Sequence, residues 1–248
     1  MASPRFLLGR VAIPAVLVAV LLGFFRPRCP PLSAVKHSVV LLTGASSGIG
    51  AELAVQYGAL GAHLVIAARR EAELSAVGEK ARAAGAASVL VVPTDMEDAA
   101  AVEHLVRACS EAHGGRLDVL FLNHARVDDG LLSSHADARS LQGILLGVFS
   151  ANLVGSALAA RAAMPLLEKS GGHIAVVSSA SAKVAAPFHG AYVTSKMALH
   201  GYFDTLRSEL KLVGSRVSVG LQVLGMIATP GACLGASVRA CRGNADAS

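Results

Sequence analysis

A tyrosine and a lysine one helical turn apart are the residues best suited to chemistry in this sequence. Tyr192 and Lys196 lie in the segment A-Y-V-T-S-K, and side chains four positions apart on a helix share one face. An ammonium beside a phenol favours the phenolate, so we expect the pKa of Tyr192 to be lowered from about 10. Such a phenol can exchange a proton with a substrate oxygen, as interconversion of a carbonyl and a hydroxyl requires.

A Tyr-x-x-x-Lys spacing alone is usually an ordinary helix face. A serine hydroxyl and a glycine-rich loop elsewhere in the sequence make a catalytic role for this pair the better interpretation. Ser179 lies just past a β-branched segment, where its hydroxyl could polarise a substrate carbonyl. The combination of the three features predicts a catalytic site for carbonyl reduction or alcohol oxidation.

The glycine-rich loop T-G-A-S-S-G-I-G joins a predicted strand to a predicted helix. Gly44 allows the tight turn, Gly48 lets the backbone approach a pyrophosphate, and Gly50 lets the helix and strand pack closely. The helix N-terminus offers free N–H groups and a partial positive charge. Glycines also serve strand-to-helix turns for steric reasons alone, but their placement here favours dinucleotide binding. The loop residues expected to bind the cofactor are Gly44, Ser46, Ser47, Gly48, Ile49 and Gly50.

The end of the second predicted strand distinguishes the two nicotinamide dinucleotides. An NAD site has an acidic residue there for the ribose hydroxyls, whereas this strand ends A-A-R-R and the first carboxylate is that of Glu71. A guanidinium suits the 2′-phosphate of NADP. The alternative is that Arg69 and Arg70 only begin a solvated helix. We predict NADP(H) as the cofactor, with Arg69 reading its phosphate.

Short β-branched runs alternate with longer Ala-rich segments of helical period from Ser38 onward. The predicted strands are Ser38–Leu42, His63–Ala67, Ser88–Val92, Asp118–Leu122, His173–Val177 and Arg216–Val223. The predicted helices are Ile49–Leu60, Glu71–Ala84, Asp98–Ala112, Val148–Lys169 and Ala191–Val213. This alternation predicts an α/β fold, a Rossmann-like doubly wound parallel sheet. A hydrophobic content of 53% and a charged content of 16% fit such a buried sheet.

Composition argues against two other classes of protein. A net charge of +5 without a basic run, no Trp and only 4% aromatic residues do not suit nucleic-acid binding. The 4 cysteines form neither a CxxC pair nor a dense framework, so no metal site is expected.

The N-terminus carries an apolar run without charge, Val11–Phe25. Together with 6–9 it approaches the roughly 20 residues of a membrane-spanning helix, and Arg10 can snorkel near one end. The segment R-P-R-C-P-P follows, without an A-x-A cleavage site. We expect residues 1–32 to be an anchor helix and linker that hold the protein in the endoplasmic reticulum membrane by a single pass. The alternative is a cleaved signal peptide and a secreted or lumenal protein; the side that the domain faces stays open.

The combined motifs resemble the short-chain dehydrogenase/reductase family over about Ser38–Thr229. They are the glycine loop, Asn123, Asn152, Ser179 and the Tyr192/Lys196 pair. Several stretches are similar to the 11β-hydroxysteroid dehydrogenase type 1 group within that family, as is the apolar N-terminus: G-A-H-L-V-I-A-A-R, L-N-H, V-V-S-S-A-S-A-K-V-A-A-P and V-L-G-M-I-A-T.

The resemblance implies a role for each matching residue. Tyr192 would be the general acid/base, Lys196 would also hold the nicotinamide ribose, Ser179 would orient the carbonyl, and Asn152 would hold a water of the proton relay. His124, where most of the family has Asn, would be a packing residue. The further cofactor-binding positions would be Asp95, Met96, Asn123, Ile227 and Thr229.

The implied protein is an NADP(H)-dependent oxidoreductase that interconverts a hydroxyl and a carbonyl on a lipophilic, steroid-like substrate, and forms a homodimer. The alternatives are a reductase of another lipophilic carbonyl such as retinal, and a non-catalytic nucleotide- or partner-binding protein. The expected domain spans 33–229, and 230–248 is expected to be an irregular tail without the family's substrate-covering segment.

Overall fold

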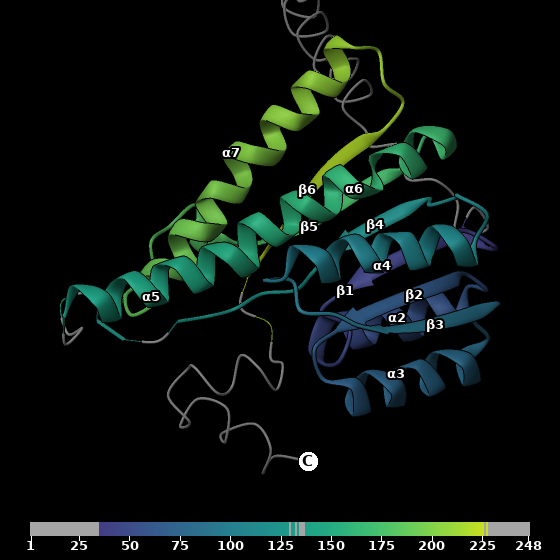
Figure 1. Ribbon diagram of the computed structural model, residues 1–248, viewed down its shortest axis with the longest axis horizontal. Helices are drawn as coiled ribbons and strands as arrows, with labels where there is room; N and C mark the ends of the chain where they lie inside the picture. Colours follow the sequence, from purple (N-terminus) through teal and green to yellow (C-terminus); the bar gives the residue numbers. More distant parts are fainter. Residues whose placement is uncertain (1–34, 129, 132, 134–136, 226, 228–248) are drawn as a thin grey trace, which may run out of the picture. The chain divides into compact units, whose positions relative to one another are not determined.

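The computed structural model describes residues 35–128, 130, 131, 133, 137–225 and 227. Their core is a six-stranded parallel sheet of order β3-β2-β1-β4-β5-β6 (Figure 1). The strands are β1 Val39–Thr43, β2 His63–Ala68, β3 Ser88–Pro93, β4 Val119–Leu122, β5 His173–Ser179 and β6 Ser218–Leu224. The predicted Rossmann-like parallel sheet is therefore confirmed, with strand ends within two residues of those expected.

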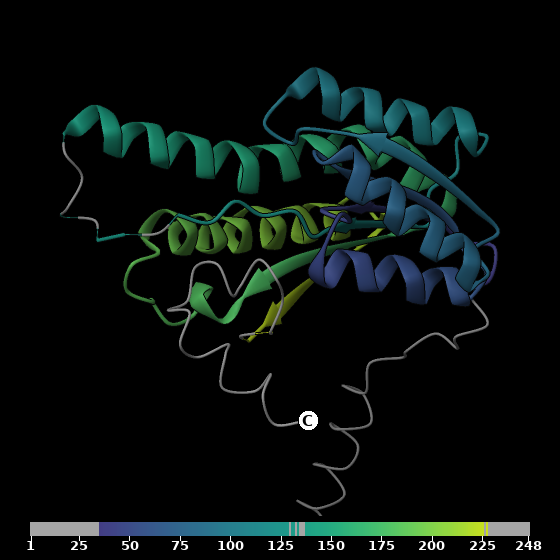
Figure 2. The ribbon, with the colours of Figure 1, turned by 90° about the horizontal axis from the view of Figure 1, so that it is seen from below.

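Helices cover both faces of this sheet (Figures 1 and 2). They are α2 Gly48–Ala59, α3 Glu71–Ala84, α4 Ala99–Ala112, α5 Ala138–Phe149, η3 Ser150–Val154, α6 Gly155–Ser170 and α7 Gly190–Leu212, with a short 3₁₀ turn, η4 Ala180–Ala182. One core cluster joins the sheet to α2 and α3, and the other joins it to α4, α6 and α7. Burial from both sides explains why β1 reads V-V-L-L-T without polar alternation.

The central helical stretch begins earlier than the sequence pattern predicts. The expected helix was Val148–Lys169, whereas α5 already begins at Ala138, where the Asp137 carboxylate accepts a hydrogen bond from the Ser140 N–H (2.7 Å). Val148 is the one buried residue of α5. Leu141, Ile144 and Val148 follow helical spacing, so the sequence did carry a signal for these first turns, and the prediction missed it.

Within the described residues, one helical stretch, 138–170, has the length and hydropathy of a membrane span. Ala159, Ala163 and Leu167 of this stretch are fully buried in the core that faces the sheet, so its apolar character is explained by packing within the domain. The predicted anchor (1–32) and the predicted tail (230–248) lie outside the described residues.

Candidate active site

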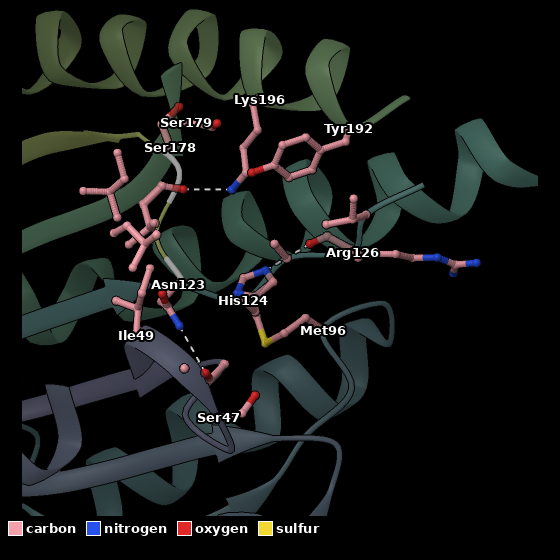
Figure 3. Close-up of a pocket in the computed structure, with 18 of the residues that line it drawn as sticks. Ser47, Ile49, Met96, Asn123, His124, Arg126, Ser178, Ser179, Tyr192 and Lys196 are labelled. Atoms are coloured by element: carbon pink, nitrogen blue, oxygen red, sulfur yellow. Dashed lines mark hydrogen bonds between the residues drawn. The ribbon is translucent and has the colours of Figure 1, made fainter. Parts of the chain in front are cut away.

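A cavity of about 930 Å³ opens at the carboxyl ends of the strands (Figure 3). β1 and β4 are neighbours in the sheet although β2 and β3 lie between them in the chain. Such a switch point is where doubly wound folds bind ligands. The predicted site residues that line the cavity are Gly44, Ser46, Ser47, Gly48, Ile49, Arg69, Asp95, Met96, Asn123, Ser179, Tyr192, Lys196 and Ile227.

Two predicted residues do not line the cavity, and Thr229 lies outside the described residues. Gly50 instead packs under the loop, where a Cβ would clash with the Gly44 carbonyl oxygen and lie 2.6 Å from Asn123 Nδ2. Asn152 is buried behind the cavity wall, at 1% exposure. Both therefore shape the site from behind.

The N-terminus of α2 is arranged to hold an anion. Its N-cap residue, Ser47, makes no capping hydrogen bond to the helix. The hydroxyls of Ser46 and Ser47 accept hydrogen bonds from Arg70 Nη2, at 3.1 and 3.0 Å. The free N–H groups of the first turn and the adjacent guanidinium fit the phosphates of a dinucleotide.

Arg70 was not among the predicted site residues, although it also lines the cavity. The Arg69-Arg70 pair in the sequence indicated a guanidinium near the cofactor phosphates, but only the fold shows which of the two contacts the phosphate loop. Asn123 holds that loop from the other side, because its Nδ2 donates to the carbonyl oxygens of Thr43 (3.3 Å) and Gly44 (3.1 Å).

The helix α7 brings Tyr192 and Lys196 to the cavity on one face (Figure 3). Lys196 is 2% exposed, and its Nζ donates to the Val177 carbonyl oxygen at 2.8 Å. Burial lowers the pKa of Lys196 to about 8. The ammonium is thus held firmly in place but gives up its proton more readily than a lysine in water.

The expected lowering of the Tyr192 pKa is wrong for this structure. Burial raises the pKa of the Tyr192 phenol, and a hydrogen bond with the Ser179 side chain opposes this shift. Lys196 Nζ lies 5.7 Å from the centroid of the Tyr192 ring, against its face. The cost of removing the phenolate from water therefore dominates over the attraction that we expected from the ammonium.

Ser179 is oriented by the turn that follows β5. Its Oγ accepts hydrogen bonds from the N–H and the hydroxyl of Ser181, at 3.2 and 2.9 Å. With both acceptor positions used, its own proton is left to donate toward the Tyr192 oxygen or a substrate carbonyl. This arrangement agrees with the polarising role predicted for Ser179.

Asn152 lies in the π-helical turn η3, a local structure often found at functional sites. Its Oδ1 accepts from the Arg126 N–H (2.7 Å), and its Nδ2 donates to the Arg126 carbonyl oxygen and to Ser195 Oγ, both at 2.9 Å. These contacts brace the segment after β4 against α7. The predicted role of holding a relay water stays a prediction.

His124 is a structural residue of the cavity wall, as predicted. Its Nε2 lies 3.0 Å from the Ala151 carbonyl oxygen, which can only accept, so Nε2 carries the proton and Nδ1 accepts from Thr43 Oγ1 at 2.8 Å. Burial and then the charge of Lys196 lower the pKa of His124 to about 4, against the Ala151 hydrogen bond. His124 is therefore neutral at physiological pH.

One ion pair of the cavity wall was not foreseen from the sequence. Arg126 Nη1 lies 3.0 Å from Glu97 Oε1, and its guanidinium fills the space where Gly147 lacks a side chain. No spacing pattern marked these residues, because they come from three separate segments.

Three exposed apolar residues lie in the cavity lining. They are Val127, Val184 and Ile227, which are 55%, 74% and 41% exposed. Apolar side chains in a cavity that also holds a phenol and a serine suit a lipophilic molecule with one polar oxygen.

Comparison with known proteins supports the assignment of the family. Residues 38–233 match the family described as short chain dehydrogenase. The chain belongs to the short-chain dehydrogenase/reductase family. Two curated relatives carry the name "Hydroxysteroid 11-beta-dehydrogenase 1-like protein". The relative from Gallus gallus is 37% identical over 90% of this chain and 76% of its own length, and that from Danio rerio is 39% identical over 79% and 67%.

Solved structures agree with this family. A short-chain dehydrogenase/reductase from Burkholderia phymatum, in complex with NAD, has a TM-score of 0.73 and 30% identity, covering 83% of this chain and 71% of its own. An alcohol dehydrogenase from Thermococcus sibiricus, complexed with 5-hydroxy-NADP, has a TM-score of 0.69 over 77% of each chain, at 23% identity, and shares the fold.

Proposed function

We propose that this short-chain dehydrogenase/reductase uses NADP(H) to interconvert a hydroxyl and a carbonyl on a lipophilic, steroid-like substrate. The observation that carries the proposal is the meeting of Ser179, Tyr192 and Lys196 in the cavity that the loop between β1 and α2 also lines (Figure 3). Such a constellation places a proton donor and a carbonyl-polarising hydroxyl next to a dinucleotide cradle.

The residues of the site divide the reaction between them. A nicotinamide cofactor, when bound, supplies or accepts the hydride. In the reductive direction Tyr192 donates its phenolic proton to the carbonyl oxygen, and Ser179 donates a hydrogen bond to the same oxygen. Lys196, fixed to the Val177 carbonyl oxygen, stabilises the phenolate that remains. In the oxidative direction the same phenolate accepts the hydroxyl proton.

The preference for NADP(H) is supported by the charges at the end of β2. Arg69 and Arg70 both line the cavity, and Arg70 reaches the serines of the phosphate loop. The first carboxylates after them belong to α3, where Glu73 faces Arg70 at 3.5 Å. Two guanidinium groups fit the 2′-phosphate better than the bare ribose of NAD.

The lipophilic substrate is supported by the apolar side chains of Val127, Val184 and Ile227 in the cavity lining, and by the names that the curated relatives carry. Purified protein is titrated with NADPH and NADH and then assayed against a panel of steroids and retinoids. We expect tighter binding of NADPH and turnover of a steroid. Turnover of retinal alone would contradict a steroid substrate and would support a reductase of another lipophilic carbonyl. NADPH binding without any turnover, or no binding, would contradict catalysis.

We further propose that residues 1–32 attach the protein to the endoplasmic reticulum membrane in a single pass. The support is the charge-free run Val11–Phe25 in the sequence. Deleting 1–32 is expected to move the protein from carbonate-washed membranes to the soluble fraction. Protein that stays in the pellet without aggregating would assign the attachment to another surface, and a soluble, processed wild type would support the cleaved signal peptide.

A homodimer through the long central helices is the remaining proposal. Leu146 and Val154 lie two turns apart on the stretch 138–170 and are 62% and 47% exposed, which leaves an apolar strip for a second copy. Sedimentation equilibrium is expected to give twice the chain mass for the wild type and a smaller mass for Leu146→Glu. A wild-type monomer would contradict the proposal.

A further inference from the structure

The segment 123–128, which we call the strap, connects the phosphate loop to the catalytic helix. At one end, Asn123 donates to the carbonyl oxygen of Gly44 (3.1 Å). In its middle, the backbone of Arg126 is held by the side chain of Asn152. At its other end, the carboxylate of Asp128 reaches the start of α7. Each contact fixes one wall of the cavity to the next.

The contact between Asp128 and α7 is a helix cap supplied from a distant part of the chain. Asp128 Oδ1 accepts from the Tyr192 N–H at 2.7 Å, and Oδ2 accepts from the Ala191 N–H at 3.1 Å. The N-cap residue, His189, gives no side-chain cap, and its Nδ1 donates to the Asp128 carbonyl oxygen at 2.8 Å. The residue that bears the catalytic phenol is thus hydrogen-bonded to Asp128 through its own backbone.

Two other helices are capped locally instead. Asp98 and Asp137 cap α4 and α5 from the position directly before each helix, as N-cap residues ordinarily do. The cap of α7 instead depends on how the strap lies, so the start of α7 and the cavity wall cannot shift independently.

The entry into α7 is held in a strained conformation. Phe188 has φ of +70°, which a bulky side chain adopts only where surrounding contacts impose it. Its carbonyl oxygen accepts from the Gly130 N–H at 2.9 Å, just beyond the strap. The contacts of Gly130 and Asp128 therefore oppose relaxation of the two residues that precede α7.

We propose that Asp128 is a positioning residue that fixes the first turn of α7 and thereby sets the Tyr192 hydroxyl against Ser179. The inference rests on the proposed function of Tyr192. Lys196 has its own anchor on the Val177 carbonyl oxygen, so loss of Asp128 displaces the phenol relative to an ammonium that stays in place. Cofactor binding, which depends on the other end of the strap, is preserved.

The test compares Asp128→Ala and Asp128→Asn with Asp137→Ala, which removes an ordinary N-cap that is not part of the cavity lining. Misplacement of a reacting group by about 1 Å can cost on the order of a hundredfold in rate. We expect Asp128→Ala to lower kcat at least about tenfold while KM for NADPH stays within about twofold. Asp128→Asn, which keeps one acceptor oxygen, should recover part of the loss, and Asp137→Ala should keep wild-type kcat.

A second readout, amide hydrogen exchange of 190–193, does not depend on catalysis. These amides should exchange faster in Asp128→Ala than in the wild type and stay protected in Asp137→Ala. A kcat near wild type with unchanged protection would overturn the inference. If Asp128→Ala does not fold, the Asn variant decides on both measurements. A wild type without turnover contradicts the proposed function, and exchange alone then decides whether Asp128 holds the first turn.

Discussion

Acidification should destabilise the fold through His124, whose neutral form the folded state favours. Its Nδ1 accepts from Thr43 Oγ1 (2.8 Å) and its Nε2 donates to the Ala151 carbonyl oxygen (3.0 Å). Protonation would add a positive charge near Lys196, in a site where burial disfavours the charged ring. Burial, together with the charge of Lys196, accordingly lowers the pKa of His124 to about 4.

The size of the effect follows from the two pKa values of His124. The unfolded chain has a histidine pKa of about 6.5, so between this value and about 4 the unfolded state binds more protons than the folded state. The contribution of His124 to stability is therefore complete above about pH 6.5 and is lost as the pH falls toward about 4. Integrated from about pH 7.5 to about pH 5, the loss is about 2 kcal/mol.

The assay is urea denaturation of the wild type and of His124→Gln across this pH range. A glutamine can donate to the Ala151 carbonyl oxygen without titrating, so the variant should lose about 2 kcal/mol less than the wild type on acidification. Burial also lowers the pKa of three other histidines, His113, His173 and His200. Both proteins contain these histidines, so their contributions cancel in the difference between the two curves. Parallel curves for the two proteins would refute the assignment of a neutral His124.

Two further substitutions test the cofactor site. Arg69→Asp should reverse the preference in binding affinity for NADPH over NADH, because a charge-assisted contact of about 1.5–3 kcal/mol becomes a repulsion. An unchanged ratio of the two Kd values would mean that Arg69 does not bind the 2′-phosphate, and Arg70→Asp would then test its neighbour. Gly50→Ala should lower the free energy of unfolding by about 1–3 kcal/mol and weaken NADPH binding, because its Cβ would meet the Gly44 carbonyl oxygen. Gly143→Ala, in α5 with nothing within 4 Å of its Cβ, is the matched control and should be at least as stable as the wild type.

The sheet could be predicted from the sequence because its central strands β1, β2 and β5 are buried on both faces. β1 and β5 are nearly continuous runs of β-branched and aliphatic residues bounded by turns, and such runs have few other folded solutions. The sequence also predicted site residues that share one helix, such as Tyr192 and Lys196 on α7, because helical spacing fixes their geometry.

Contacts between distant segments could not be predicted in the same way. The cap that Asp128 gives to α7, the brace of Asn152 and the ion pair of Arg126 with Glu97 each join segments that only the fold brings together. The direction predicted for the shift of the Tyr192 pKa was wrong for the same reason. Its sign depends on how far the phenol is buried, which spacing along a helix does not reveal.

Proton transfer by Tyr192 is the central claim, and one substitution tests it most directly. Tyr192→Phe keeps the ring but removes the hydroxyl, so NADPH affinity should stay within a few-fold while turnover falls at least about a hundredfold. Tyr202→Phe is the control, because Tyr202 lies on the same helix, is 40% exposed and does not line the cavity. The account predicts loss of turnover in Tyr192→Phe alone. Turnover near wild type in Tyr192→Phe, with NADPH bound, would contradict it.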